Sequence, residues 1–170
     1  MGDYMLIPLS KGRHAKVSPE DYERLSKYSW HYHPGRFGKG YARGGPGKGR
    51  VMMHRFILNA PKDIQVDHAN HDPLDNRRSN IRPCTHRQNI QNLSRVRGDL
   101  PKGVSLWAPS RRFAANYAPG FTRYRTRITV NGRRIHVGTY RTVEEAARAY
   151  DDAAKKHFGE FAFLNYPNDH

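Results

Sequence analysis

The sequence predicts an α+β chain made of two small polar modules. Short runs of β-branched and aromatic residues end in turns rich in Gly and Asn, which is typical of antiparallel strands. Two Thr residues are each followed three positions later by Gln or Glu, a capping box that opens a helix. The 170 residues are 36% hydrophobic, and their mean hydropathy is -0.91. Each core is therefore expected to be small.

The first 60 residues are expected to form a scaffold of short strands with one helix. A strand is predicted around residues 15–17. Ser18 then supplies an N-cap and Pro19 the first helical position, so a helix should begin there. The Gly-rich segment 40–56 predicts a hairpin with its turn at residues 44–49.

Residues 66–92 predict a strand, a loop, a second strand and a helix. This stretch holds three His, three Asp and five Asn, a density that a plain surface loop does not require. The first strand ends at Asp67 and His68, and the second covers residues 80–83. Thr85 and Gln88 form a capping box, which places Asn89 in the first turns of a short helix. His54, upstream, is expected to pack beneath this cluster.

After a polar break at residues 92–101, a second hairpin is predicted. Asn131-Gly132 is a favoured two-residue turn, and it sets the register of the flanking strands. The expected pairs are Val130 with Arg133, Ile128 with Ile135, and Arg127 with His136. Because side chains alternate along a strand, one face is apolar. The other face carries Arg123, Arg125, Arg127, Arg134 and His136.

A helix is expected to cover the apolar face of this hairpin. Thr142 and Glu145 form a capping box, a stripe of mostly small residues follows at helical spacing, and Gly159 ends the helix. The predicted organisation is thus a first domain at residues 1–95, a linker at 96–102 and a second domain at 103–170.

The charge distribution indicates a polyanionic partner. Thirty Lys and Arg stand against fifteen Asp and Glu, a net charge of +15. Residues 24–62 contain nine basic residues and no acidic one, and residues 103–143 contain eight Arg and again no acid. Such single-sign segments repel themselves unless a polyanion such as nucleic acid binds them.

Composition also excludes several classes of protein. No apolar run approaches the length of a membrane span, and no amphipathic helix is suited to insert, so no membrane partner is expected. Cys84 is the only cysteine, which excludes an internal disulfide and a zinc site with several cysteines. A cytoplasmic location, in a bacterial host or encoded by a phage, is expected, and no protein partner is evident.

The residue types at 66–92 suit phosphodiester hydrolysis. That reaction needs a metal to neutralise charge, a base to activate water, and a group that orients the base. Asp67 and Asn89 offer an anionic and a neutral oxygen, which suit Mg²⁺ or Mn²⁺ if the helix packs on the strands. His68 follows Asp67 directly and would lie beside the metal without binding it.

This stretch, "VDHANHDPLDNRRSNIRPCTHRQNIQN", resembles the HNH endonucleases in the form found in phage and mobile-element homing nucleases. The resemblance implies a ββα-metal fold with Asp67 and Asn89 as metal ligands and His68 as general base. It also implies that Asn80 positions His68. Many relatives have His at the last position, and Asn89 follows the homing-enzyme variant. Arg82, within the motif, is a candidate for DNA contact.

The C-terminal part resembles the AP2 DNA-binding domain. The likeness rests on "KGVSLW" and on residues 126–167, and it departs from the family at residues 108–124, where the link between the first two strands is longer. It implies a three-stranded antiparallel sheet packed on one helix that binds double-stranded DNA. Together the two resemblances describe a metal-dependent DNA endonuclease, with Mg²⁺ or Mn²⁺ as cofactor, that is targeted by its second domain.

Two other functions stay open. The chain could be a catalytically inert, sequence-specific DNA-binding regulator, but all four active-site positions hold chemically competent residues, which favours the enzyme. An RNA-binding protein is the more distant alternative, with Trp107, Phe113 and Tyr117 as possible base-stacking residues.

Overall fold

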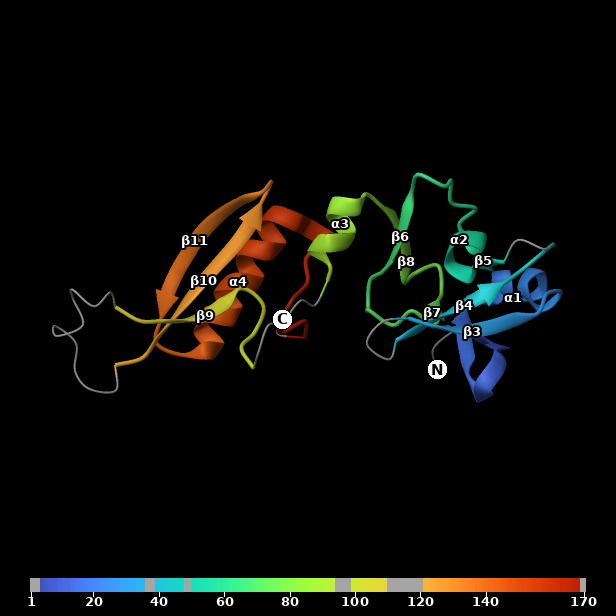
Figure 1. The fold of residues 1–170 in the computed structure, drawn as a ribbon, viewed down its shortest axis with the longest axis horizontal. Coiled ribbons are helices and arrows are strands. Elements are labelled where there is room, and N and C mark those ends of the chain that lie inside the picture. The colour runs from blue at the N-terminus through green and yellow to red at the C-terminus, as the bar shows by residue number, and fades with distance from the viewer. Residues whose placement is uncertain (1–3, 36–38, 48–49, 94–98, 110–120, 169–170) are drawn as a thin grey trace. The chain divides into compact units, whose positions relative to one another are not determined.

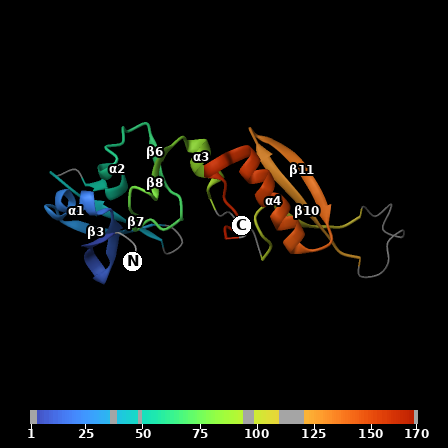
Figure 2. The same ribbon diagram turned by 180° about the vertical axis from the view of Figure 1, so that it is seen from behind.

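The computed structural model of the chain describes residues 4–35, 39–47, 50–93, 99–109 and 121–168. It is a mixed α+β structure with small sheets and few helices, as predicted (Figures 1 and 2). The chain divides into two compact units, residues 1–90 and 91–170. The predicted linker at 96–102 lies partly outside the described residues, and Phe113 and Tyr117 lie wholly outside them. The predicted domain boundaries therefore stay a prediction.

The first unit contains three small sheets. In one, β1 (Met5–Pro8) pairs antiparallel with β2 (His14–Val17) across the short helix η1 (Ser10–Gly12), and β2 pairs parallel with β7 (Asp75–Asn76). The second sheet has the order β3 (Trp30–Pro34), β4 (Gly40–Gly44) and β5 (Val51–Met52). In the third, β6 (Gln65–His68) pairs antiparallel with β8 (Ile81–Cys84).

Three short helices accompany these sheets: α1 (Pro19–Ser26), α2 (Met53–Ile57) and α3 (His86–Gln91). α1 begins at Pro19 as predicted, but its N-cap Ser18 makes no capping bond with its side chain. The Ser18 hydroxyl instead accepts a bond of 2.9 Å from the Arg78 amide. The predicted hairpin 40–56 is shorter than expected, because residues 53–57 form α2.

One hydrophobic core supports the first unit. Val17, Leu25 and Met53 are completely buried, and Trp30 donates its indole N–H to the Leu25 carbonyl at 2.9 Å. Buried Asp21 is paired with Arg24 at 3.2 Å and with Arg78 at 2.7 Å. Since Arg78 lies 57 positions from Asp21, this cluster fixes the loop before β8 to α1.

The second unit contains a three-stranded antiparallel sheet of order β11-β10-β9, followed by α4 (Val143–Phe158) and η4 (Gly159–Phe161). Its strands are β9 (Val104–Trp107), β10 (Arg123–Val130) and β11 (Arg133–Tyr140). The register next to the turn is confirmed, since Val130 lies opposite Arg133, Ile128 opposite Ile135 and Arg127 opposite His136. Asn131 and Gly132 have φ of 52° and 79°, the left-handed pair that such a turn requires.

Helix α4 packs on this sheet through small and aromatic side chains. Its core joins Ile128 to Tyr150 and Ala154, and the buried Thr126 hydroxyl donates to the Ala146 carbonyl at 2.7 Å. Both hydrogen bonds of the predicted capping box at Thr142 and Glu145 are formed. Ile135 lies opposite the buried Ile128, so the alternation of side chains places it on the apolar face that a helix is predicted to cover. It is nevertheless 39% exposed, because β11 is an edge strand of the sheet.

Among the helices of the described residues, none combines the length and the apolar character that a membrane span needs.

Candidate active site

The candidate site begins at the end of β6, where Asp67 and His68 are both buried. Asp67 lies opposite Arg82 on β8, and His68 lies opposite Ile81. Because side chains alternate along a strand, Asp67 shares its face with Gln65, whereas His68 leaves on the other side. The side chains of these two adjacent residues therefore lie in different surroundings, on opposite faces of β6.

Asp67 is bound by Arg82. The guanidinium donates from Nη2 and Nε to the same carboxylate oxygen, Oδ2, at 2.9 and 3.1 Å. This contact fixes the carboxylate at the strand end and balances its charge in a buried setting. Arg82, a predicted DNA-contact residue, is thus placed against the predicted metal ligand, with its side chain 17% exposed.

Helix α3 brings Asn89 to the Asp67 side of β6. The capping box is formed: the Thr85 amide donates to the Gln88 side chain at 2.8 Å, and the Gln88 amide donates to the Thr85 hydroxyl at 3.3 Å. One turn on, the Asn89 side-chain nitrogen donates to Gln65 Oε1 at 2.8 Å. This bond uses the NH₂ of the amide and leaves its oxygen, the atom predicted to bind a metal, out of the contact.

His68 lies on the other side of β6 in an aromatic and amide environment. Its ring is 4.9 Å from that of His54 between centroids, at an angle of 84°, and 6.2 Å from Tyr41. His68 Nε2 lies 3.3 Å from the side-chain oxygen of Asn76. Burial lowers the pKa of His68, while Asn76 and the carboxylate of Asp67 act in the opposite direction.

Asn76 is a site residue that the spacing of the motif does not identify. It lies on β7, is completely buried, and its side-chain nitrogen has no hydrogen-bond partner among the described residues. Burying an amide whose NH₂ group has no hydrogen-bond partner costs folding free energy. The fold keeps Asn76 in this position despite that cost, and its side-chain oxygen contacts His68 there. Its position depends on the parallel pairing of Val17 with Asn76, to which no local pattern points.

Asn80, the residue predicted to position His68, holds the loop between β6 and β8. Its NH₂ donates to the Asp75 carbonyl at 2.7 Å, and its side-chain oxygen accepts from the Asn70 amide at 3.0 Å. Its own carbonyl accepts from the Ala69 amide at 2.9 Å. Asn80 thus fixes the backbone that follows His68 directly.

The same loop is braced by an ion pair between the buried Asp75 and the partly exposed Arg77. Arg77 donates to both oxygens of Asp75, at 2.8 and 2.6 Å, and Asn70 donates to one of them at 2.9 Å. Burial raises the pKa of Asp75, but the bonds from Arg77 and Asn70 outweigh burial and hold it below its usual value. The loop is therefore kept in one conformation by charge-assisted bonds.

The donor set fits a divalent cation with a preference for oxygen. Asp67 and Asn89 offer one carboxylate and one amide oxygen on the same side of β6, and water or phosphate oxygens can complete such a site. Nowhere in the described part of the chain, this site included, does a group of three or more His, Cys, Asp or Glu side chains lie together in a way that could hold a metal ion.

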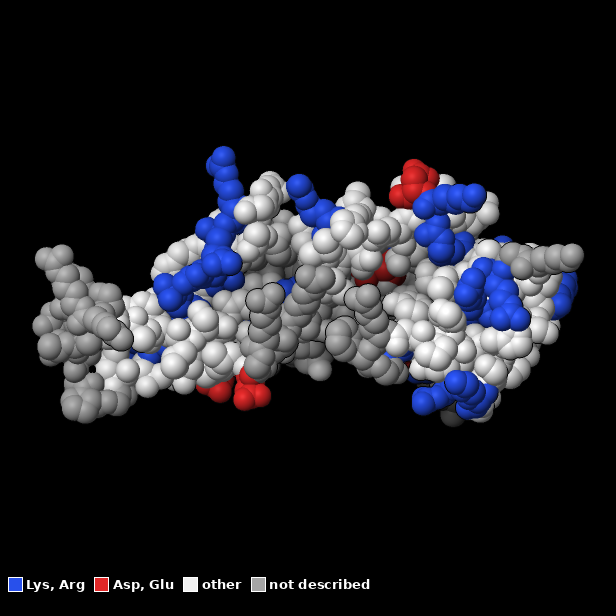
Figure 3. All heavy atoms as spheres, viewed as in Figure 1, with Lys and Arg blue, Asp and Glu red and all other residues white. Residues whose placement is uncertain are grey.

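The predicted DNA-binding side chains lie together on the hairpin of the second unit. Arg123, Arg125 and Arg127 alternate along β10, while Arg134 and His136 lie on β11. Burial lowers the pKa of Arg127, and the positive charges of Arg125 and Arg134 lower it further. Figure 3 shows Lys and Arg atoms gathered over β10 and β11 on the face in view. These cations repel one another in the free protein, which an anionic ligand would relieve.

Comparison with known proteins identifies the first unit. The model of an HNH endonuclease family matches residues 51–91, which contain Asp67, His68, Asn80 and Asn89. An uncharacterized HNH endonuclease of Acanthamoeba polyphaga mimivirus is 32% identical over 168 residues, covering 95% of this chain and 80% of the relative.

The second unit has a shorter match, and no solved structure matches the chain. A stretch of 36 residues is 53% identical to the dehydration-responsive element-binding protein 2A of Arabidopsis thaliana, covering 21% of this chain and 11% of the plant protein. The mimivirus relative, in contrast, is matched along most of its length. The family model matches the segment that contains the buried Asp67 and His68, and the mimivirus relative is similar along most of both chains. The chain therefore belongs to the HNH endonuclease family.

Proposed function

We propose that this protein is a metal-dependent DNA endonuclease that hydrolyses phosphodiester bonds with His68 as general base. The observation that carries the proposal is the arrangement at the end of β6. Asp67 and Gln65, which binds Asn89, share one face of β6, and the buried His68 imidazole lies on the other face, which supports the proposal. Membership in the HNH family supports the reaction class.

His68 is suited to accept a proton from water. Its lowered pKa, caused first by burial, keeps the imidazole neutral near pH 7. The Asn76 oxygen can only accept a hydrogen bond, so the neutral ring carries its proton on Nε2 and its lone pair on Nδ1. The water proton passes to Nδ1 while the water oxygen attacks phosphorus, and the bond from phosphorus to the leaving oxygen breaks.

Asp67 and Asn89 are the proposed ligands of the cation. A divalent ion bound there supplies positive charge to the phosphate as negative charge develops on it. Arg82 and Gln65 orient these two ligands through the bonds described above. HNH nucleases generally use divalent ions, and the oxygen-only donor pair favours Mg²⁺ or Mn²⁺.

The second unit is proposed to target the enzyme to double-stranded DNA as an AP2-like domain. The sheet β9–β11 with α4 presents cations on β10 and β11, and a two-stranded ribbon fits the major groove. The short likeness to the plant element-binding protein supports this role. The second candidate function is a DNA-binding regulator without catalytic activity. The same arginines would bind DNA in that case, so the two candidate functions differ only in whether the DNA is cut.

Cleavage of plasmid DNA with Mg²⁺, with and without EDTA, tests the proposed enzyme. His68→Ala is expected to reduce the cleavage rate by about 10²- to 10⁴-fold, as loss of a general base does, while DNA affinity stays close to the wild-type value. His31→Ala, which removes an exposed imidazole from β3, is the matched control. Full activity of the His68 variant would refute the assignment, and an inactive wild type would favour the regulator.

The DNA-binding role of the sheet has its own test. Changing Arg123, Arg125 and Arg127 together to Ala should lower the slope of log affinity against log salt by about 0.9 for each phosphate that the variant no longer binds. A control that removes three cations away from this face changes Arg141, Lys155 and Lys156 to Ala. Affinity and slope that stay at the wild-type values in the first variant would show that the sheet does not bind DNA.

A further inference from the structure

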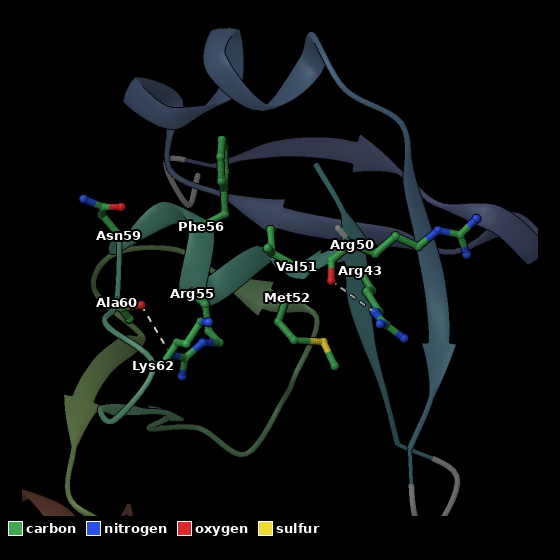
Figure 4. A pocket seen from close by; sticks show the side chains of 9 residues that line it. All are labelled: Arg43, Arg50, Val51, Met52, Arg55, Phe56, Asn59, Ala60 and Lys62. Atoms are coloured by element: carbon green, nitrogen blue, oxygen red, sulfur yellow. Dashed lines mark hydrogen bonds between the residues drawn. The ribbon is translucent and has the colours of Figure 1, made fainter. Parts of the chain in front are cut away.

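A basic cavity lies in the first unit, between β4, β5 and α2. It has a volume of about 420 Å³, and four of the residues that line it are cationic: Arg43, Arg50, Arg55 and Lys62. Figure 4 shows Arg43 and Arg50 on one side of Val51 and Met52, and Arg55 with Lys62 on the other. No acidic residue is among the described residues of the wall.

Two of these cations shape the cavity. The Arg55 guanidinium donates to the carbonyls of Ile64, at 2.7 Å, and Ala60, at 3.3 Å, and so holds the loop that leads into β6. Arg43 donates to the Arg50 carbonyl at 3.5 Å and holds the start of β5. A bond to a carbonyl does not neutralise a guanidinium, so both positive charges remain.

The other two cations are available to a ligand. Arg50 and Lys62 are exposed, and neither side chain forms an ion pair with any carboxylate of the described residues. Between them, Val51 and Met52 provide an apolar floor. The cavity therefore offers cationic walls to an anion and an apolar surface to the group that carries it.

We infer that this cavity binds the backbone of a DNA strand, with Arg50 and Lys62 contacting its phosphates. Phosphodiesters are the anions that such crowded, unneutralised cations bind, and the apolar floor suits the sugar between two phosphates. The inference rests on the proposed function and extends it. Helix α2 contains both Arg55, which lines the cavity, and the preceding residue His54, whose ring contacts that of His68. A strand held in the cavity would thus be held near the candidate base.

The test compares two full-length double variants that lose the same charge. Arg50→Gln with Lys62→Gln changes the cavity, whereas Lys11→Gln with Lys27→Gln changes exposed cations elsewhere in the unit. Affinity for a fluorescent duplex of about 40 base pairs is measured by anisotropy in EDTA, so that no cleavage occurs, over a range of salt concentrations. The cavity variant should lower the log–log slope by about 1.8, at 0.9 for each of the two phosphates, and the control should keep the wild-type slope.

Equal slopes for the cavity variant and the wild type would overturn the inference, and so would equal losses of affinity in both variants. A loss of affinity seen with polyglutamate but not with the duplex would assign the cavity to an acidic peptide and also overturn it. Cleavage is measured separately with Mg²⁺. A wild type that cuts nothing would refute the proposed function and leave the comparison of slopes intact.

Discussion

His54 should make the first unit sensitive to acid. The imidazole is buried against His68 and Tyr41. Burial is the main cause that lowers the pKa of His54 from 6.5 to about 3, and the charge of Arg55 and that of His68 when it is protonated act in the same direction. The folded unit therefore holds this side chain neutral at pH values where the unfolded chain protonates it.

The sign and size of the effect follow from proton linkage. Above pH 6.5 the ring is neutral in both states and contributes nothing to the pH dependence. Between pH 6.5 and 3 the unfolded chain binds a proton that the folded chain does not, so the free energy of unfolding decreases as the pH falls. The decrease is about 1.4 kcal/mol per pH unit, or roughly 2.7 kcal/mol between about pH 7.5 and 4.5.

The assay is urea denaturation at these two pH values, followed by tryptophan fluorescence. Trp30 and Trp107 are the only tryptophans, so Trp107→Phe leaves the buried Trp30 as a reporter of the first unit. In that background His54→Gln should lose about 2.7 kcal/mol less stability on acidification than the unchanged chain. His31→Gln, at an exposed position of β3, controls for the loss of an imidazole.

The comparison isolates one group, because His68 and the carboxylates titrate in both proteins. If His54→Gln lost as much stability between the two pH values as the unchanged chain, the imidazole would have to be protonated in the folded unit. The inferred burial against His68 would then be wrong.

Two further predictions concern the site and the second unit. Asp67→Ala should abolish Mn²⁺ binding in calorimetry, because the only charged ligand of the proposed metal site is lost, and unchanged binding would refute the proposed ligand set. Gly103→Ala should destabilise the second unit in thermal denaturation by about 1–3 kcal/mol more than Gly132→Ala. Both glycines have positive φ, but a Cβ at Gly103 would meet the ring of Tyr150, whereas nothing lies within 4 Å at Gly132. Equal destabilisation by the two substitutions would contradict this packing.

Several features that depend on neighbouring residues were predicted correctly from the sequence, although the Ser18 side chain does not form the predicted cap. The Asn131-Gly132 turn determined the pairs next to it, and the capping boxes at Thr85 and Thr142 began helices where expected. The register shift between Thr126 and Arg127 was not predicted, since one extra residue in β11 leaves no distinct pattern in the chain. Local chemistry specifies turns and caps, and bulges arise from the packing of the whole sheet.

The sequence predicts the residue types of the candidate site, but it does not predict the contacts that these residues make. The motif predicts Asp67, His68 and Asn89 as site residues, which stays a prediction. It gives no sign that the partner of His68 nitrogen Nε2 is Asn76, which pairing with a parallel strand near the start of the chain holds there. Arg82 was expected to contact DNA. The alternation of side chains along one strand does not show which residue of the partner strand lies opposite, so it did not reveal that Arg82 faces Asp67. Contacts across sheets depend on tertiary structure, which spacing along the chain does not encode.

Cys84 gives this site a built-in chemical reporter. It is the only cysteine, it is 5% exposed, and it lies opposite Gln65 at one end of the hairpin whose other end holds Asp67 and His68. Burial also raises the pKa of its thiol, so a labelling reagent meets little thiolate in the native state. The rate at which a maleimide modifies the unmutated protein therefore measures how often β6 and β8 separate. If DNA or a divalent ion binds at the proposed site and tightens the hairpin, it should slow that labelling, and no turnover has to be observed.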